Sequence, residues 1–317
     1  MNVQAIKAPI LPDPLRASLA AALEQINGLV LGKEREVRLA FTTLLAGGHL
    51  LIEDLPGLGK TTLARSMAAT LALDFQRMQF TSDLLPSDII GVSIFDPTSR
   101  EFRFHPGPVF AQLVLADEIN RAPPRTQSAL LEAMAEQQVT VDGVCHALPQ
   151  PFFVMATQNP ADLAGTFPLP DSQLDRFLLR LQLGYPDAEA EREMLAGGDR
   201  REMVAAAMPQ LTGADLAALR AGVAQVHASE ALVAYVQSLL AESRRHRGVR
   251  VGLSPRAGLA LLQGARAHAL LAGRAHVLPE DVQALFVEVA AHRLVPEAEA
   301  GTREALAASI LKAVAVD

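Results

Sequence analysis

The stretch LIEDLPGLGKTTLA, from Leu51 to Ala64, limits the folds open to this chain more than any other part of it. A short apolar run leads into a loop that contains Pro56, Gly57 and Gly59, and a helical pattern begins at Lys60. A strand that turns through glycines into a helix presents backbone N–H groups and the positive end of the helix dipole to an anion. The stretch therefore predicts an α/β fold with a phosphate-binding loop.

Asp54 stands where loops of this kind usually carry their first glycine. The phosphate-binding N–H groups are expected after this position, and aspartate is one of the few other residues that tolerates a turn or left-handed geometry. The candidate phosphate-binding residues are Pro56, Gly57, Leu58, Gly59, Lys60, Thr61 and Thr62. We expect Lys60 to reach the β- and γ-phosphate oxygens and the Thr61 hydroxyl to bind Mg²⁺.

Short apolar runs in the first part of the chain alternate with helical patterns, which is typical of a parallel sheet covered on both faces. The runs are His49–Glu53, Phe75–Phe80, Leu113–Asp117, Phe152–Thr157 and Phe177–Leu183. Helices are expected over Lys60–Leu71 and Arg125–Gln137, because apolar residues recur there at helical spacing. The pattern predicts an α/β domain with a five-stranded parallel sheet.

After Tyr185-Pro186 the strand-like runs stop, and segments rich in alanine and leucine predict a helical domain. Ser254 followed by Pro255 is a typical helix start, with the serine as N-cap and the proline at the first helical position. We therefore expect an N-terminal helical extension (1–26), an α/β core (27–184) and a C-terminal all-α domain (185–317).

Two segments predict β-hairpins inserted into the α/β core. VTVDGVCHAL carries β-branched runs on either side of Asp142-Gly143, a pair typical of two-residue hairpin turns. SIFDPTSREFRFHPGPVF also has a hairpin pattern, with Asp96-Pro97 at its turn. Both hairpins are expected to project from the edges of the sheet.

Polar side chains follow two of the predicted strands. In LVLADEIN the apolar run ends in Asp117 and Glu118. When such a pair follows a phosphate loop, the aspartate suits Mg²⁺ binding and the glutamate suits polarisation of water. In FFVMATQNP the apolar run ends before Asn159, which either orients the attacking water, senses the γ-phosphate or makes an Asn-Pro turn. With the loop, these residues predict Mg²⁺-dependent hydrolysis of ATP.

Two arginines are candidates for contacts with phosphate. Arg176, in LPDSQLDRFLL, either pairs with Asp175, faces solvent, or reaches the γ-phosphate of a neighbouring subunit. Arginines supplied in this last way accelerate phosphoryl transfer by on the order of a thousandfold or more. Arg256, in LSPRAG, lies in the first turn of a helix, where a cation opposes the helix dipole, so an anionic partner explains it better than helix stability does.

Composition limits the classes of partner and compartment. The net charge of -7 and the pI of about 5.7 argue against a surface built mainly for nucleic acid or anionic lipid. Cys145 is the only cysteine, which excludes an intrachain disulfide and suits a reducing compartment. Prolines interrupt the apolar residues of the N-terminus, and no later run is long and apolar enough for a membrane span, so we expect a cytoplasmic protein.

The ordered series EDLPGLGKT, VLADEINRAPPRTQSALLEAM, ATQNP, LPDSQLDRF and SPRAGL resembles the AAA+ ATPases of the MoxR family. The resemblance covers nearly the whole chain, from INGLVLGKEREVRLAF to the last helices, and the block from Asn120 to Met134 is its most specific part. It implies an αβα P-loop ATPase core, a helical lid and a ring of subunits, expected to be hexameric, with sites between them. Because ED before the loop is familiar in this family, Asp54 does not depart from its pattern.

The resemblance also implies roles for particular residues. Lys60 and Thr61 match the phosphate and Mg²⁺ ligands, and Asp117 and Glu118 match the Mg²⁺-binding and water-activating pair. Asn159 matches the first sensor, Arg176 the arginine finger and Arg256 the second sensor. The segment that cups adenine is matched by Val30, Leu31 and Gly32. The two hairpins resemble the helix-2 and pre-sensor insertions of this group of ring ATPases. The family's known roles imply a protein client that is matured or assembled, often with cofactor insertion, and a partner with a von Willebrand factor A domain.

Three other classes remain as alternatives. A magnesium-chelatase-like ATPase subunit has similar motifs, but the block NRAPPRTQSALLEAM favours the MoxR family. A nucleic-acid motor or clamp loader is disfavoured by the acidic net charge and by the lack of basic and aromatic residues in VTVDGVCHAL. A nucleotide-binding module without turnover would be expected to lack Glu118 or Arg176, and both are present.

Overall fold

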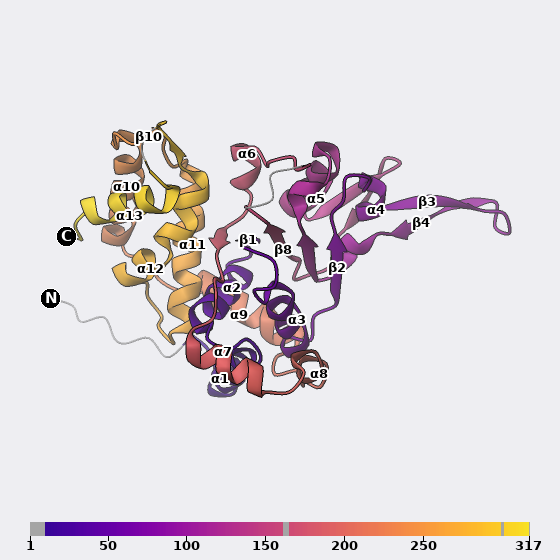
Figure 1. The fold of residues 1–317 in the computed structure, drawn as a ribbon, viewed down its shortest axis with the longest axis horizontal. Coiled ribbons are helices and arrows are strands. Elements are labelled where there is room, and N and C mark those ends of the chain that lie inside the picture. The colour runs from indigo at the N-terminus through magenta and orange to yellow at the C-terminus, as the bar shows by residue number, and fades with distance from the viewer. Residues whose placement is uncertain (1–9, 161–164, 299–300, 317) are drawn as a thin grey trace.

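The computed structural model describes residues 10–160, 165–298 and 301–316, so residues 1–9 of the expected N-terminal extension lie outside this description. An α/β sandwich is followed by a mainly helical part (Figure 1). The parallel strands are β1 (Leu50–Glu53), β2 (Phe75–Gln79), β5 (Leu113–Asp117), β8 (Phe153–Gln158) and β9 (Leu179–Leu181). Their order across the sheet is β2-β5-β8-β1-β9, which confirms the predicted five-stranded parallel sheet.

Alternate residues of the strands pack into two cores, one on each face of the sheet. Leu50 and Ile52 of β1 belong to one core, and Leu51 between them belongs to the other. The first core contains α1 (Asp13–Leu29), α2 (Glu34–Leu45) and α3 (Lys60–Thr70), and the second contains α4 (Pro86–Ile90) and α5 (Pro124–Glu136). Because successive strand residues point to opposite faces, burial of both faces requires the continuous apolar runs seen in the sequence.

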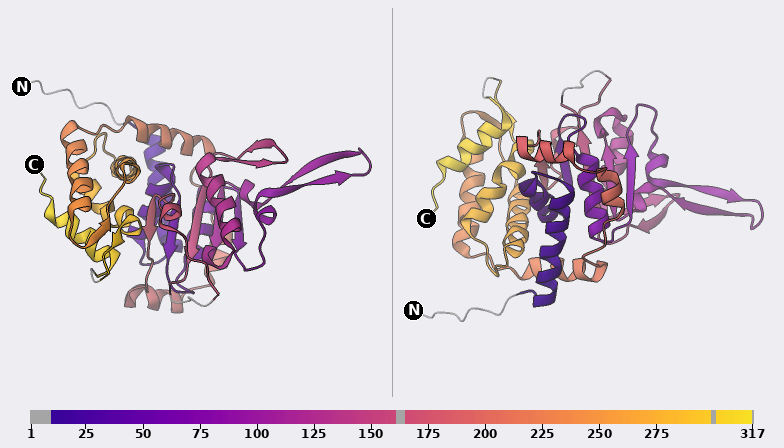
Figure 2. Two further views of the ribbon diagram at one scale, coloured as in Figure 1. Left: turned by 90° about the horizontal axis from the view of Figure 1, so that it is seen from above. Right: turned by 60° about the horizontal axis from the view of Figure 1, so that its bottom comes forward.

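Both predicted hairpins are confirmed. Strands β3 (Gly91–Asp96) and β4 (Glu101–Pro106) pair antiparallel, as do β6 (Gln138–Val141) and β7 (Val144–Ala147). Asp142 and Gly143 have φ angles of 50° and 78°, which a tight hairpin turn of this type requires. The β3–β4 hairpin extends far beyond the rest of the protein, and the β6–β7 hairpin is shorter (Figure 2).

The C-terminal part is mainly helical but also contains strands. Its helices are α7 (Ala188–Ala196), α8 (Arg200–Ala205), α9 (Gly213–Gln225), α10 (Glu230–Arg245), α11 (Pro255–Leu271), α12 (Pro279–Ala290) and α13 (Arg303–Ala313). The expectation that strands end before this part is wrong, because β10 (Val249–Val251) and β11 (Val295–Pro296) pair antiparallel. The predicted start of α11 is confirmed: Ser254 Oγ accepts a hydrogen bond from the Ala257 N–H at 3.2 Å.

The sandwich and the helical part share one core. The core that contains α1, α2 and α3 continues into α9, α11 and α12. Helices α7 and α8 lie beside α1 and α3, whereas α10 to α13 gather on the other side of β9 (Figure 1). Among the described residues, no helix combines the length and the apolar character needed to cross a membrane.

Two buried histidines make the fold sensitive to acid. The Nδ1 atom of His49 accepts a hydrogen bond from the Val154 N–H at 3.1 Å, and its Nε2 lies 3.2 Å from the Met134 carbonyl oxygen. The ring is therefore neutral, with its proton on Nε2, and burial lowers its pKa to about 4. Burial likewise lowers the pKa of His292, whose Nε2 lies 3.0 Å from the Phe177 carbonyl oxygen.

Acidification from about pH 7.5 to about pH 5.5 should lower the free energy of unfolding by ~1.4 kcal/mol for each of these histidines. The unfolded ring, with a pKa near 6.5, binds a proton that the folded ring excludes, so this stability is present above about pH 6.5 and is lost as the pH falls towards 4. Urea unfolding at the two pH values measures the loss. His49→Gln should show a smaller pH dependence than the parent, and an equal dependence in both would contradict this account.

Candidate nucleotide site

The loop between β1 and α3 has the backbone conformation of an anion site. Gly57 and Gly59 have φ angles of 85° and 89°, in the left-handed region that favours glycine. Apart from the two chain neighbours, no atom of the described residues lies within 4 Å of the place where a Cβ would stand on either glycine, so conformation rather than space requires glycine here. Because α3 begins at Lys60, the unpaired N–H groups of its first turn adjoin the loop.

Asp54 fixes the start of the loop through its carboxylate. Its Oδ1 accepts a hydrogen bond from the Leu55 N–H at 2.9 Å, and its Oδ2 accepts one from the Gly184 N–H at 2.7 Å. Asp54 is not among the residues with positive φ, so a left-handed backbone is not the reason that aspartate suits this position. The carboxylate instead ties the loop to the chain just after β9.

Lys60 lies close to the loop and to the acidic residues at the end of β5. Its Nζ donates to the carbonyl oxygens of Asp54 at 2.7 Å and Leu55 at 3.0 Å. Burial lowers the pKa of Lys60, and the carboxylates of Asp54, Asp117 and Glu118 oppose that shift. The ammonium group therefore stands between backbone oxygens and carboxylates, where an incoming phosphate can replace its carbonyl partners.

Asp117 ends β5 with both carboxylate oxygens bound. Its Oδ1 accepts a hydrogen bond from Thr157 Oγ1 at 2.6 Å, and its Oδ2 accepts bonds from Arg77 Nη2 at 2.7 Å and Nε at 3.1 Å. Thr157 lies on β8 and Arg77 on β2, the two neighbours of β5 in the sheet. Three adjacent strands therefore hold this carboxylate in place.

Glu118 has a left-handed backbone, with φ 56° and ψ 50°. A non-glycine residue in this region carries a strain of about 1–3 kcal/mol, and such residues cluster at functional sites. Its N–H donates to Thr157 Oγ1 at 2.9 Å, and its Oε2 accepts from Gln79 Nε2 at 2.9 Å and lies 3.0 Å from Arg121 Nε. Thr157 therefore binds both members of the acidic pair.

A cavity of about 460 Å³, which we call the main cavity because it contains the phosphate loop, brings most of the predicted site together. The predicted residues that line it are Val30, Leu31, Pro56, Gly57, Leu58, Gly59, Lys60, Thr61, Thr62, Asp117, Glu118 and Asn159. Gly32 is not a lining residue: its φ is 64°, and a Cβ there would come within 2.7 Å of the Ala190 Cβ. The cavity size suits a small ligand, the loop and Lys60 suit phosphate, and the oxygens of Thr61 and Asp117 suit Mg²⁺.

Arg176 and Arg256 line a different cavity, of about 240 Å³, which shares no lining residue with the first. His49, just before β1, lines this second cavity, whereas Asp54 begins the phosphate loop at the other end of the strand. At ~3.3 Å per strand residue, the chain from His49 to Asp54 spans about 17 Å, which is longer than an arginine side chain. Both arginines are therefore out of reach of their own subunit's phosphate loop.

Asp175 is bound by an arginine other than its sequence neighbour. Arg293 Nε donates to Asp175 Oδ1 at 2.6 Å, and Arg256 Nε lies 4.0 Å from Oδ2. Arg176 Nη1 instead donates to the Leu131 carbonyl oxygen at 2.6 Å. The alternative in which Arg176 pairs with Asp175 is therefore wrong for the described part of the chain. Asp175 instead pairs with Arg293, which belongs to the helical part.

Four residues contact the acidic pair without having been predicted as site residues, and Arg121, three positions after Glu118, is one of them. Arg77 and Gln79 line the main cavity from β2, and Thr157 is buried beneath it on β8. The available signal was the polar spacing in β2, where two long polar side chains two positions apart share one face. Thr157 stands inside the quoted ATQNP stretch, but one threonine in an apolar run carries no signal of its own.

Comparison with known proteins gives one consistent result. A family model described as "ATPase family associated with various cellular activities (AAA)" matches residues 49–179, and one described as "AAA lid domain" matches residues 241–311. "Uncharacterized protein YeaC" of Bacillus subtilis (strain 168) is 44% identical over 308 residues, 96% of each chain. "Chaperone MoxR1" of Mycobacterium tuberculosis is 39% identical over 291 residues, 88% of this chain and 76% of that one.

A solved structure extends the similarity to the fold. The crystal structure of a candidate ATPase from Cytophaga hutchinsonii superimposes on this chain with a TM-score of 0.87 and 34% sequence identity. The match covers 96% of both chains, so it includes the α/β sandwich and the helical part together.

Proposed function

Since this chain belongs to the MoxR family of AAA+ ATPases, we propose that it hydrolyses ATP with Mg²⁺ in a ring of identical subunits whose neighbours complete each other's active sites. One observation carries this proposal: Arg176 and Arg256 lie at the opposite end of β1 from the phosphate loop. Arg77 lines the cavity of its own subunit but is bound to Asp117. Arg176 and Arg256, in contrast, can reach a phosphate only if a neighbouring subunit presents it. Head-to-tail contacts of this kind close into a ring, for which we propose six subunits.

Nucleotide binding falls to the loop and to the segment after α1. The N–H groups of residues 57–62 would hold the β-phosphate, and Lys60 would exchange its bonds with the carbonyls of Asp54 and Leu55 for phosphate oxygens. Val30 and Leu31 line the cavity where adenine would lie. Bound Mg²⁺, held by the Thr61 hydroxyl and the Asp117 carboxylate, would supply positive charge against the charge that develops on the transferred phosphate.

Glu118 is the residue that we propose to activate water. Its strained backbone follows directly after Asp117, and its side chain lines the cavity beside the Mg²⁺ ligand. A carboxylate oxygen there can accept the proton of a water molecule as that water attacks the γ-phosphate. Asn159 lines the same cavity and would orient this water.

The client of this ATPase is proposed to be a protein. The similarity to a protein named a chaperone supports a role on a protein client. We propose that this role is maturation, assembly or cofactor insertion, carried out with a partner that has a von Willebrand factor A domain. The projecting β3–β4 hairpin exposes Phe95 and Phe102, which are 49% and 73% exposed and suit apolar contacts with a polypeptide. Cys145 is free and exposed, which suits the reducing cytoplasm where we place this activity.

Removal of Mg²⁺ with EDTA should stop ATP turnover by the parent protein. Asp117→Asn should weaken ADP binding in Mg²⁺ by roughly tenfold, because a neutral amide is a poorer ligand than a carboxylate, while metal-free ADP binding should change little. Fluorescence titration with a labelled ADP, with and without EDTA, measures both affinities. Undiminished turnover after metal removal would contradict the proposed Mg²⁺ dependence.

A further inference from the structure

The segment from Asp175 to Leu178 carries Arg176 between α6 (Asp171–Leu174) and β9. Two of its N–H groups donate to carbonyl oxygens outside the segment. Phe177 N–H donates to that of Leu174 at 3.1 Å, and Leu178 N–H donates to that of His49 at 2.8 Å. The segment is neither helix nor strand, so its carbonyl groups need partners from elsewhere.

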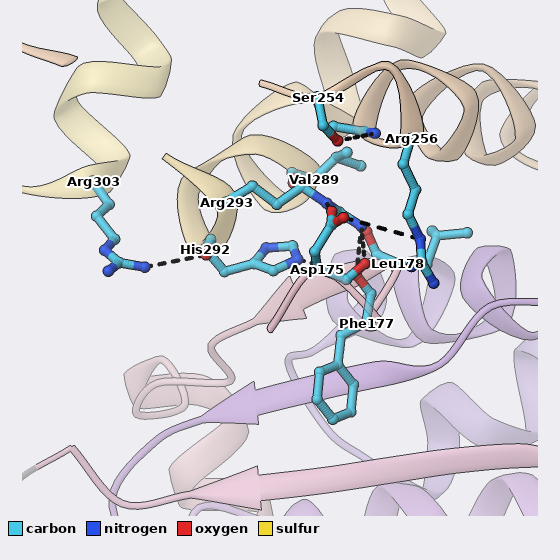
Figure 3. Close-up of polar contacts among 10 residues, drawn as sticks. Asp175, Phe177, Leu178, Ser254, Arg256, Val289, His292, Arg293 and Arg303 are labelled. Carbon is cyan, nitrogen blue, oxygen red and sulfur yellow. Dashed lines mark hydrogen bonds and ion pairs between the residues drawn. The ribbon is translucent and has the colours of Figure 1, made fainter. Parts of the chain in front are cut away.

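One buried guanidinium supplies these partners. Arg293 Nη2 donates to the carbonyl oxygens of Asp175 at 3.3 Å and Phe177 at 2.6 Å, and its Nη1 donates to that of Leu178 at 3.1 Å (Figure 3). Its Nε binds the Asp175 carboxylate, and its Nη1 also binds the Val289 carbonyl at the end of α12. The side chain of Arg293 is 4% exposed. Its planar fork therefore joins the helical part to three carbonyls of the segment.

The burial of this charge has a cost that the contacts must offset. Burial lowers the pKa of Arg293, and the bond to Asp175 opposes that shift. Removing one partner of a buried charged pair is strongly destabilising, yet an apolar pair can hold two elements together as well. What an apolar pair cannot do is fix three carbonyl groups in one orientation. The arrangement therefore suits precise placement of backbone better than it suits bulk stability.

We propose that Arg293 is a positioning residue for Arg176, holding its backbone so that its side chain can reach the neighbouring subunit's phosphate. This rests on the proposed function, in which Arg176 acts across the subunit interface. Arg293 binds the residues on both sides of Arg176, while the Leu131 carbonyl binds the Arg176 head group. A misplacement of only ~1 Å at a catalytic group can cost about a hundredfold in rate. Arg293 borders the same cavity as Arg176, but its buried side chain is engaged by the segment, so we infer that it controls turnover through the placement of Arg176.

Arg293→Lys tests the proposal, because lysine keeps the charge but lacks the fork. We expect kcat to fall about tenfold or more, with the affinity for labelled ADP and KM for ATP unchanged. Arg303→Lys is the matched control. Arg303 also spans the two parts, donating to the His292 carbonyl and to Asp171, both at 3.1 Å, but does not bind the 175–178 segment. It should retain the parental kcat.

A double-mutant cycle separates positioning from general loss of stability. If Arg293 acts through Arg176, then Arg176→Ala/Arg293→Lys should turn over no more slowly than Arg176→Ala alone in single-turnover assays. Multiplying losses, or full turnover by Arg293→Lys beside a defective Arg176→Ala, would overturn this inference and leave the proposed function intact. Full turnover by Arg176→Ala would instead overturn the proposed function. Should Arg293→Lys fail to fold, Asp175→Asn takes its place with the same expectations. Because this change also removes the carboxylate 4.0 Å from Arg256 Nε, the combination with Arg176→Ala is again the deciding measurement.

Discussion

Glu118→Gln should still bind ATP but should hydrolyse it at least about a hundredfold more slowly, a loss typical of removing a general base. The change removes the carboxylate that would accept the proton of the attacking water, whereas Lys60, Thr61 and Asp117 keep their positions. Gln79 Nε2, which donates to Glu118 Oε2 at 2.9 Å, can donate to the amide oxygen of the new side chain. ATP affinity and phosphate release measured on the same preparation give the two quantities.

The control for this variant is Glu24→Gln. Glu24 is exposed on α1 and does not line the main cavity, so its replacement removes the same charge without touching the site. It should hydrolyse ATP at the parental rate. Turnover by Glu118→Gln within about twofold of the parent would place the water-activating group elsewhere.

Arg176→Ala should bind nucleotide with unchanged affinity, and its kcat for ATP hydrolysis should fall by between about tenfold and about a thousandfold. The reason is its position, because it lines the second cavity together with Arg256, at the far end of β1 from the phosphate loop. An interaction made only in the transition state lowers kcat and kcat/KM together and leaves binding unchanged.

The matched control is Arg250→Ala, an exposed arginine on β10 that lines neither cavity. It should keep both nucleotide affinity and kcat. If Arg176→Ala instead raised KM at an unchanged kcat, Arg176 would contribute to ground-state binding and not to the chemical step.

The sheet could be predicted from the sequence because its strands are buried on both faces. Two-sided burial needs continuous apolar runs, and the run Leu113–Asp117 coincides with β5 at both ends. The hairpin turn at Asp142-Gly143 could also be predicted, since turn chemistry is local and both residues have positive φ. The phosphate loop follows β1 and the acidic pair stands at the end of β5, so these lining residues could also be predicted, unlike Arg77 and Gln79 within β2.

Features that depend on contacts between distant segments could not be predicted. Strands β10 and β11 have three and two residues, too few to show a periodic pattern. The pair between Arg293 and Asp175 joins residues 118 positions apart, and neither residue stands in a motif that indicates the other. The distance of Arg256 from its own phosphate loop depends on how α11 packs beside the sandwich. The sequence motif identifies Arg256 as a candidate but does not indicate which subunit's nucleotide it contacts.

If each active site is shared between two subunits, a mixture of two inactive variants should hydrolyse ATP. Arg176→Ala keeps a complete phosphate loop, and Lys60→Ala keeps a complete arginine cavity. In rings assembled at random from equal amounts, about a quarter of the interfaces join the good loop to the good arginine. We therefore expect ATP turnover to recover to as much as about a quarter of the parental rate, although neither variant alone hydrolyses ATP appreciably. Tagged chains must first show that subunits exchange, and exchange without recovered hydrolysis would contradict the shared site.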